Sequence, residues 1–503
     1  MRVLFAASEA YPLAKTGGLG DVAGALPAAL AERGADVRLL MPGYPAALDA
    51  LVGGRVESSL NGLLSVPVGR LISGWLPGSG IRAWLVDAPS LFDRDGGPYA
   101  DADGVEWADN ALRFSYLSHV AALLSLGLIG HWRADVAHAN DWHTGLVPMM
   151  LAGAGGRRPK TVFTIHNLAF QGNFTFDTAR RVGVPASRLT VDGCEFYGRA
   201  SFLKAGLQFA DGITTVSPTY AREILGSELG CGMDGMLRSR ERDLVGILNG
   251  ASLGQWSPAS DPHIPAHFGP RDISGKRACK AALQRELGLP VDPEAPLLGF
   301  MSRLTQQKMA DVLVEALPWL AAQGAQFAMV GDGDPRLQAA FEDAARRHPA
   351  NVAVRIGYQE PLAHRVCAGS DMLLAPARFE PCGLTQLYGM RYGSLPIVRR
   401  TGGLADTVVD ADEHTLLHGA ATGFSFDEPT ADGLTSAISR ALRAWREPLA
   451  WRRLQRQAMA QDFGWDRSAE QYLQLYSDLT GLPVPALPES VPAEAEALPL
   501  IRA

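Results

Sequence analysis

Two stretches about 300 residues apart share one strand–helix–strand pattern, and this recurrence constrains the fold more than any other feature of the sequence. Each unit contains, in order, an apolar run, a segment with helical apolar spacing and a second apolar run. The units lie at 2–7, 18–33 and 37–41, and at 297–302, 309–322 and 326–330. Alternating strands and helices predict parallel sheets with helices on both faces, so we expect two doubly wound α/β domains.

Further short apolar runs, each followed by a polar loop, extend the series in both halves. We expect these runs to form strands at 135–141, 161–167, 212–217, 352–357 and 371–380. In open α/β sheets ligands bind beyond the C-terminal ends of the strands, and most polar clusters of this sequence stand directly after such a run. A cleft between the two domains is therefore the expected functional site.

Composition limits the classes of ligand that the protein can bind and the cellular compartment that suits it. The chain has 503 residues, of which 47% are hydrophobic and 20% charged, as expected of folded domains with large cores. A net charge of −7 gives no broad attraction for nucleic acid or for an anionic membrane, so a few local cations must hold any anionic ligand. Five cysteines without a C-x-x-C pair fit a reducing compartment. With no membrane-length apolar run and no secretory leader, we expect a cytoplasmic protein.

A glycine-rich loop, KTGGLGD at 15–21, follows the first expected strand. Glycines there let a ligand approach the backbone, and a helix N-terminus beside Lys15 favours an anion. A dinucleotide fingerprint is excluded because about ten residues separate the strand from Gly18, whereas that fingerprint follows its strand directly. The loop therefore predicts an anion site, with a plain glycine-rich turn as the alternative.

Two loops of the second half carry the other chemistry-bearing groups. Arg303 and Lys308, in SRLTQQK, could neutralise a diphosphate or remain solvated, and as exposed loop cations we expect them to add little to folding stability. Glu380 stands just before a helix start, where it could bind hydroxyls, stabilise positive charge on a sugar carbon, or serve the helix dipole. Phosphate oxygens could be held by the amides of Gly383 and Leu384 and the hydroxyl of Thr385.

A polar cluster follows two neighbouring strands of the first half. His138, Asp141 and His143 lie within six residues, and His166-Asn167 stands at the end of the next strand. Such side chains can bind zinc, but neither H-E-x-x-H nor another zinc spacing is present. We therefore expect this cluster to recognise a sugar and its hydroxyls, with a metal site as the alternative.

Taken together, these motifs resemble those of the bacterial glycogen synthases and the related starch synthases. The matching segments are KTGGLGDV (15–22), DWH (141–143), FTIHNLAFQG (163–172), SFLKAGLQFADGITTVSPTYAREI (201–224), SRLTQQK (302–308), FEPCGLTQLYG (379–389) and RRTGGLADTV (399–408). The resemblance implies two facing Rossmann-like domains with an inter-domain cleft. It also implies transfer of glucose from ADP-glucose to the non-reducing 4-hydroxyl end of an α-1,4-glucan such as glycogen, with retained anomeric configuration and with no metal or other cofactor.

The same resemblance, together with local composition, predicts how the chain is divided into domains. It implies an N-terminal catalytic domain on the glucan side at 1–248 and a C-terminal domain that binds the nucleotide sugar at 276–465. The stretch 249–275, rich in Gly, Pro, Ser and His, is the expected joint between them. A C-terminal helix at 466–480 and a mobile, proline-rich tail at 481–503 complete the expected organisation.

Carried over residue by residue, the resemblance also assigns roles. The implied catalytic residues are Glu380, His166, Arg303, Lys308 and Asp141. The implied substrate-binding residues are Lys15, Gly18, Asp21, Asn167, Asn249, Tyr358, Cys382, Gly383, Leu384 and Thr385. Among them Lys15 would bind ADP-glucose, Arg303 and Lys308 would hold its diphosphate, and Tyr358 is placed like the residue that stacks on adenine.

The chain departs from the family pattern at three places, which bear on hinge behaviour and turnover rather than on reaction type. Ala251-Ser252 stands where the family usually has Val-Asp, Met309 where a glycine follows the lysine, and Asn140 where histidine is common. Two rival functions stay open. One is another nucleotide-sugar transferase of the trehalose or sucrose type, many of which carry a second glutamate where this chain has Tyr388. The other is a non-catalytic glucan-binding protein.

A retaining glycosidase needs two carboxylates at close range, and here Glu380 is the natural candidate, with Asp141 left open as the second. That shortage favours same-face transfer, assisted by the departing diphosphate, over a covalent glycosyl-enzyme.

Overall fold

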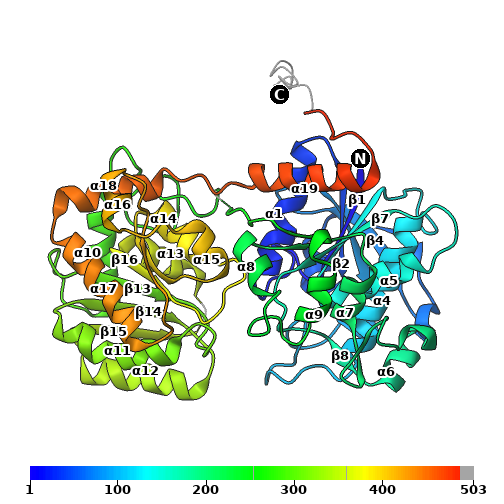
Figure 1. The fold of residues 1–503 in the computed structure, drawn as a ribbon, viewed down its shortest axis with the longest axis horizontal. Helices are drawn as coiled ribbons and strands as arrows, with labels where there is room; N and C mark the ends of the chain where they lie inside the picture. Colours follow the sequence, from blue (N-terminus) through cyan, green and yellow to red (C-terminus); the bar gives the residue numbers. More distant parts are fainter. Residues whose placement is uncertain (253, 358, 488–503) are drawn as a thin grey trace, which may run out of the picture.

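Two largely parallel sheets organise the residues that the computed structural model describes, namely 1–252, 254–357 and 359–487. The larger sheet has the strand order β12-β11-β7-β6-β1-β2-β5-β4-β3, and the smaller one has the order β15-β14-β13-β16-β17-β18. Figure 1 shows the two sheets in two domains that lie side by side, the first coloured blue to green and the second green to orange. The predicted pair of doubly wound α/β domains is confirmed.

The first domain is built on the larger sheet. Its strands are β1 (Arg2–Ala6), β2 (Asp36–Pro42), β3 (Val52–Ser59), β4 (Arg70–Trp75), β5 (Arg82–Asp87), β6 (Val136–Asn140), β7 (Lys160–Ile165), β11 (Gly212–Thr215) and β12 (Leu244–Gly246). Its helices are α1 (Gly18–Glu32), α2 (Pro45–Ala50), α3 (Pro89–Phe92), α4 (Asn110–Leu126), α5 (Leu146–Ala152), α6 (Phe176–Arg181), α7 (Phe202–Phe209), α8 (Pro218–Glu223) and α9 (Asp234–Ser239). A small separate sheet consists of β8 (Asn173–Phe174), β9 (Glu195–Phe196) and β10 (Arg199–Ser201).

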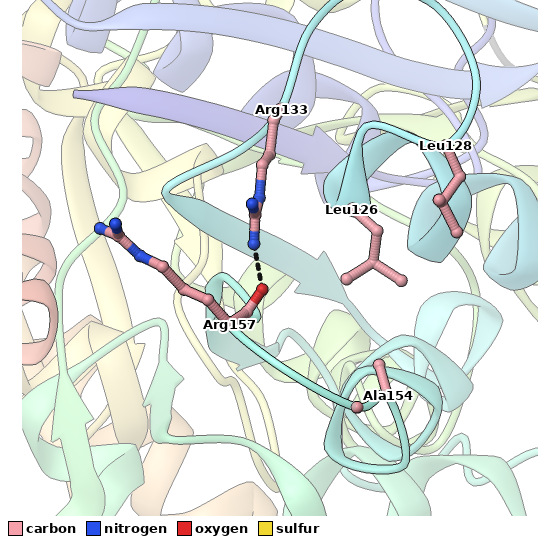
Figure 2. Close-up of a pocket in the computed structure, with 6 residues that line it drawn as sticks. Leu126, Leu128, Arg133, Ala154 and Arg157 are labelled. Atoms are coloured by element: carbon pink, nitrogen blue, oxygen red, sulfur yellow. Dashed lines mark hydrogen bonds between the residues drawn. The ribbon is translucent and has the colours of Figure 1, made fainter.

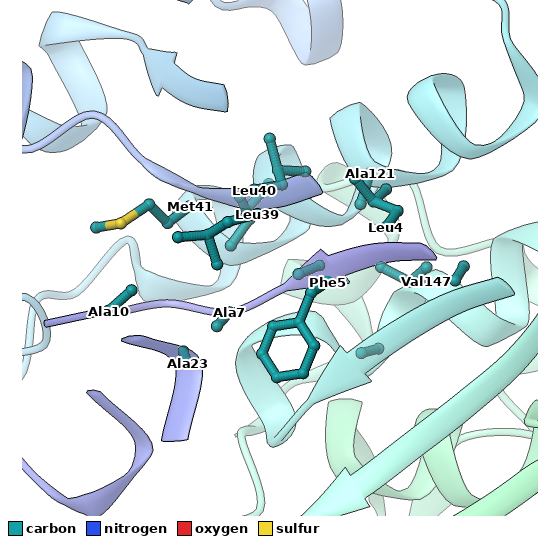
Figure 3. Packing of buried hydrophobic residues seen from close by; sticks show 14 of the residues in the cluster. Leu4, Phe5, Ala7, Ala10, Ala23, Leu39, Leu40, Met41, Ala121 and Val147 are labelled. Carbon is teal, nitrogen blue, oxygen red and sulfur yellow. The ribbon is translucent and has the colours of Figure 1, made fainter. Parts of the chain in front are cut away.

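Helices on both faces explain why β1 reads as a continuous apolar run. Leu4 and Phe5 are fully buried, and Figure 3 shows their side chains on opposite faces of the strand, with Leu4 toward Ala121 of α4 and Val147 of α5. Successive residues of a strand point to opposite faces, so a strand covered on both sides needs apolar residues at every position. This core fixes β1, and with it the loop that leads to α1.

The second domain is built on the smaller sheet, in which every pair of neighbouring strands is parallel. Its strands are β13 (Leu297–Met301), β14 (Gln326–Gly331), β15 (Val352–Ile356), β16 (Met372–Ala375), β17 (Leu395–Arg399) and β18 (Phe424–Phe426). Its helices are α10 (Gly275–Leu287), α11 (Ala310–Ala322), α12 (Pro335–Arg347), α13 (Glu360–Gly369), α14 (Thr385–Arg391), α15 (Gly402–Thr407), α16 (Glu413–Leu417), α17 (Ala431–Trp445) and α18 (Pro448–Met459). The stretch 249–275 supplies buried side chains to this core, namely Ala251, Trp256, Ile264 and Phe268.

The last helix, α19 (Trp465–Thr480), belongs to the packing of the first domain. Tyr472 and Tyr476 are buried in the core of that domain, and Figure 1 shows α19, in red, extending across from the second domain. Of the stretch 481–503, Pro485 and Ala486 lie against Gly34, and residues 488–503 lie outside the described part of the chain. Among the described helices, none is both long and apolar enough to span a bilayer.

Candidate functional site

The glycine-rich loop folds back onto its own lysine at the start of α1. The ammonium of Lys15 lies 2.8 Å from a carboxylate oxygen of Asp21, and a Cβ on Gly20 would approach Lys15 Cγ to 3.1 Å. Gly18 is exposed, and a Cβ there would meet nothing within 4 Å. Burial raises the pKa of Asp21, Lys15 opposes this, and the carboxylate of Glu360 in the second domain adds to the rise. The loop and the second domain thus influence one another electrostatically.

Glu9, which the sequence analysis missed, anchors this loop from below. Its carboxylate is 2% exposed and accepts hydrogen bonds from the backbone N–H of Thr16 and, at 2.8 Å, from the Thr16 hydroxyl. Burial raises the pKa of Glu9, while the Thr16 donors lower it. A buried carboxylate with two donors fixes the backbone one residue beyond Lys15. A charged residue two positions after the expected strand at 2–7 was the available signal.

The ends of β6 and β7 bring three of the polar residues together. Asp141 accepts a 2.8 Å hydrogen bond from the backbone N–H of His166, and its backbone is held at φ 54°, a rare conformation outside glycine. Asn140 donates to the carbonyl of Ala6 at 3.0 Å, so its amide oxygen is the acceptor that faces His166 Nε2 at 2.9 Å. Nε2 of His166 therefore carries the proton, and Nδ1 is the acceptor nitrogen.

Burial sets the charge states of this group. It lowers the pKa of His166 to about 3, so the ring is neutral at pH 7. It raises the pKa of Asp141 to about 7, although the backbone N–H groups of His166 and Asn167 favour the ionised form. Neutral His166 and Asp141, whose pKa is raised, are suited to hydrogen bonding with hydroxyl groups.

His138 and His143 form no hydrogen bond with Asn140, Asp141 or His166 among the described contacts. His138 is buried, its Nδ1 lies 2.6 Å from the hydroxyl of Tyr476 and its Nε2 lies 2.6 Å from that of Thr164. The ring of His143 stacks on Tyr99 with ring centres 4.5 Å apart. Within the described residues, no three His, Cys, Asp or Glu side chains are arranged to hold a metal ion. Both histidines are therefore held by neighbouring rings or hydroxyls, although His166 is near enough to lower the pKa of each.

In the second domain, Lys308 and Glu380 form an ion pair between the loops that follow β13 and β16. Their side chains are 20% and 13% exposed, so the expectation that Lys308 is an exposed loop cation is wrong. Arg303, in the same loop, is exposed as expected. The expected strand 371–380 ends at Ala375, so Glu380 lies on a loop.

Backbone contacts fix the loop that carries Glu380. Gly383 has a φ of 75°, which favours glycine, and the side-chain amide of Gln386 donates to its carbonyl at 2.9 Å. The backbone N–H of Gly403 donates to the Glu380 carbonyl at 3.1 Å. A Cβ on Gly402 would approach that carbonyl oxygen to 1.9 Å, so the close approach requires glycine. The sequence analysis missed the supporting roles of Gln386, Gly402 and Gly403.

The remaining predicted residues lie on or beside this loop. Burial raises the pKa of Cys382 to about 12, so it is a thiol, and Asn249 donates to its sulfur. Leu384 and Thr385, at the start of α14, are half-buried. Tyr358, the expected adenine platform, lies outside the described residues.

Met309 adopts the left-handed conformation (φ 51°) directly before α11, with its side chain fully buried. Glycine takes this conformation freely, whereas a residue with a Cβ pays about 1 kcal/mol. The chain keeps the backbone geometry that suits glycine at this position and adds a core side chain.

Helices α8 and α15 tie the two domains together, and Figure 1 shows them adjacent. Asp406 of α15 accepts hydrogen bonds from the backbone N–H and the hydroxyl of Thr219, at 2.8 and 2.6 Å. Glu223 of α8 accepts bonds from the Thr401 hydroxyl and the Gly402 N–H, both at 3.0 Å. Each helix thus places an acidic side chain at the start of the other. Because Gly402 also packs on Glu380, this α8–α15 contact connects the first domain to the Glu380 loop.

A pocket of about 420 Å³ lies away from these residues (Figure 2). Arg133 and Arg157 line it, and the Arg133 guanidinium donates to the Arg157 carbonyl. These residues precede β6 and β7, so the pocket lies at the opposite end of the strands from Asp141 and His166.

Comparisons with known proteins find two family models along the chain. Residues 2–239 match the family model described as the starch synthase catalytic domain, and residues 295–444 match glycosyl transferases group 1. The chain is 54% identical over 481 residues to a glycogen synthase of Burkholderia thailandensis, covering 95% of this chain and 90% of the relative. It is 52% identical over 484 residues to a glycogen synthase of Paramagnetospirillum magneticum, covering 96% and 98%.

Solved structures with the same two-domain fold were also found. The catalytic domain of starch synthase IV from Arabidopsis thaliana, bound to ADP and acarbose, superposes with a TM-score of 0.86 at 32% identity, covering 96% of this chain and 99% of that one. A sucrose-phosphate synthase from Thermosynechococcus elongatus, at 17% identity and a TM-score of 0.58, shares the fold.

Proposed function

The chain belongs to the glycogen synthase family, and on that premise we propose that the candidate residues of its two domains bind ADP-glucose and the end of a glucan. The enzyme is a retaining glycosyltransferase that moves glucose from ADP-glucose to the non-reducing 4-hydroxyl of an α-1,4-glucan. The observation that carries the site assignment is the Lys308–Glu380 pair, a cation and a carboxylate held together where two strands of the second domain end.

The second domain supplies the charges that the departing diphosphate needs. When the bond between the glucose C1 and the phosphate oxygen breaks, negative charge grows on ADP, and Arg303 and Lys308 offset it. The Gly383–Leu384 turn and Thr385, held by Gln386, contact the phosphate oxygens in this proposal. Lys15 reaches the same diphosphate from the first domain.

The first domain receives the acceptor. We assign to His166 a hydrogen bond with a sugar hydroxyl through its acceptor nitrogen Nδ1, because Nε2 is already engaged with Asn140. Asp141 and Asn167 lie beside it and bind further hydroxyls. As the acceptor O4 bonds to C1 of glucose, its proton passes to the departing phosphate oxygen on the same face. Glu380 stabilises the positive charge that develops on the sugar.

A double-displacement mechanism through a glycosyl-enzyme needs two close carboxylates. At the position where many related transferases carry a second glutamate, Tyr388 stacks on Trp256 with ring centres 4.1 Å apart. This aromatic contact belongs to the second core and supplies no nucleophile. The proposal therefore relies on the diphosphate as the base.

The test is a rate measurement on the purified protein with glycogen and either ADP-glucose or UDP-glucose. We expect release of ADP that depends on glycogen, chain growth by α-1,4 linkage, and much slower release of UDP. Equal rates with both donors would refute the donor assignment. Turnover that needs glucose 6-phosphate or fructose 6-phosphate in place of glycogen would show a trehalose- or sucrose-type transferase instead.

A further inference from the structure

The start of α15, in the second domain, is capped by a side chain of the first domain. Thr401 stands at the N-cap position, but its side chain accepts no hydrogen bond from the helix. The first amides of a helix have no partner within the helix, so an acceptor must come from elsewhere. Here the Gly402 N–H and the Thr401 hydroxyl donate to the carboxylate of Glu223 in α8, which lies beside α15 in Figure 1.

The Glu223 carboxylate serves this turn with both of its oxygens. Oε1 accepts from the Thr401 hydroxyl and from the Gly402 N–H, both at 3.0 Å, and Oε2 lies 3.1 Å from the same N–H. Thr401 is 2% exposed and Glu223 is half-buried, so water competes little for these bonds. Hydrogen bonds to an ionised carboxylate are roughly twice as strong as neutral ones. The cap therefore holds residues 401–403, which we call the Thr401–Gly403 turn.

This turn packs directly on the loop that carries Glu380. The backbone N–H of Gly403 donates to the Glu380 carbonyl at 3.1 Å, and a Cβ on Gly402 would lie 1.9 Å from the same oxygen. A Cβ on Gly403 would lie 2.2 Å from the carbonyl oxygen of Cys382. Because so close a contact leaves no free space, a shift of the Thr401–Gly403 turn also shifts Glu380.

Other anchors of the Glu380 loop come from the second domain itself. The side-chain amide of Gln307 donates to the Phe379 carbonyl at 3.2 Å, and the guanidinium of Arg399 donates to the Arg378 carbonyl at 2.5 Å. These anchors move with the second domain and hold the loop whatever the first domain does. The Thr401–Gly403 turn differs from them, because its own position depends on a carboxylate of the first domain.

We propose that Glu223 is a positioning residue for glucosyl transfer, which holds the Thr401–Gly403 turn and through it keeps the Glu380 carboxylate at the glucose. This inference rests on the proposed function, in which Glu380 stabilises positive charge on the sugar. Glu223 contacts neither substrate and acts through Glu380. A misplacement of about 1 Å in a catalytic site can cost on the order of 10²-fold in rate, so a residue of this kind has a measurable effect.

The first test compares Glu223→Ala, Glu223→Gln and Asp406→Asn with wild type in the assay of ADP release with glycogen. Asp406→Asn is the matched control, because it weakens the bond to Thr219 in the same α8–α15 contact and leaves the Glu223 cap in place. We expect Glu223→Ala to lower the turnover number about tenfold, and Asp406→Asn to change KM for ADP-glucose with the turnover number within about twofold of wild type. Glu223→Gln keeps an acceptor oxygen and should stay within about threefold of wild type.

The second test adds Glu223→Ala to Glu380→Gln. A positioning residue acts only through the group that it positions, so the added loss of turnover should be less than about twofold. A residue that merely helps the two domains to dock would cost the same factor in both backgrounds. Thermal melting checks that each variant is folded. If Glu223→Ala does not fold, Thr401→Val takes its place, since it removes one donor and keeps the shape, and should lower turnover about threefold.

A turnover number of Glu223→Ala within twofold of wild type would overturn the inference. Equal losses in the wild-type and Glu380→Gln backgrounds would overturn it too, as would a loss in Glu223→Gln as large as that in Glu223→Ala. Each of these results, obtained with an active wild type, leaves the proposed function standing. A wild type that releases no ADP with glycogen refutes the proposed function, and this inference with it.

Discussion

Replacing Glu380 by glutamine is expected to tighten the binding of ADP while it slows glucosyl transfer. The Glu380 carboxylate holds Lys308, and Lys308 is one of the cations assigned to the diphosphate. Glutamine has nearly the same size but no charge, so it frees Lys308 and removes a negative charge beside the phosphates. Turnover should fall on the order of 10²-fold, because the same carboxylate stabilises positive charge on the sugar.

The magnitude follows from the exposure of the pair. Two unit charges about 4 Å apart attract with about 4 kcal/mol at an effective dielectric constant near 20. The side chains are 20% and 13% exposed, so water and salt screen part of this energy, and desolvation offsets more. A net difference of about 1–2 kcal/mol remains, which corresponds to a Kd for ADP about 5–30 times lower in Glu380→Gln.

Calorimetric titration with ADP, without glucan, measures this directly for wild type, Glu380→Gln, Lys308→Met and the double variant. Lys308→Met should bind ADP more weakly than wild type. In the Lys308→Met background, adding Glu380→Gln should improve the affinity less than it does in wild type, because there is no lysine to release. An affinity of Glu380→Gln equal to or weaker than that of wild type would refute the reasoning. So would an equal gain in both backgrounds.

Three further outcomes test other parts of the site. The pKa of Asp141 is raised to about 7, so the folded protein holds this proton more tightly than the unfolded chain does. The free energy of unfolding should therefore fall by on the order of 4 kcal/mol as the pH rises from 4 to 7. Urea unfolding of Asp141→Asn should lack this fall, and parallel pH profiles of the variant and wild type would contradict the expectation. Asp406→Asn, which weakens the bond to Thr219 across the domains, should raise KM for ADP-glucose about threefold to tenfold without lowering the melting temperature, and unchanged kinetics would show that domain closure does not use this contact. Lys15→Gln should weaken donor binding and slow turnover. In the double variant Lys15→Gln/Lys308→Ala, the loss of turnover should be smaller than the product of the two single losses. Strictly multiplicative losses would show that the glycine-rich loop does not share the donor site.

Strands whose residues are buried on both faces could be predicted from the sequence. β1 and β13 are covered on both faces, so their apolar runs stand out, and the helices between strands show a clear period. The antiparallel edge formed by β3 and β4 was not predicted, because β3 reads VGGRVESS and is mostly exposed. Its pairing depends on neighbouring strands rather than on a pattern of its own.

For the site, the positions of loops were predictable, whereas contacts between distant residues were not. Strand ends in the sequence located the loops of Lys15, Asp141 and Arg303, since ligands bind at those ends in this fold class. The contact of Glu223 with Gly402 joins residues 179 positions apart, and no local pattern encodes it. The same holds for Lys308, whose partner lies 72 positions away and which was therefore expected to be an exposed cation.

The placement of α19 has a consequence for synthesis on the ribosome. Tyr472 and Tyr476 complete the core of the first domain, and the Tyr476 hydroxyl satisfies His138 from the far end of the chain. Domains generally fold as they emerge, beginning at the N-terminus. Here the second domain, whose core uses residues 251–459, is fully translated before the last helix of the first domain exists. The domain made first is therefore completed last, and a nascent chain that stops before Trp465 holds a finished second domain beside an unfinished first.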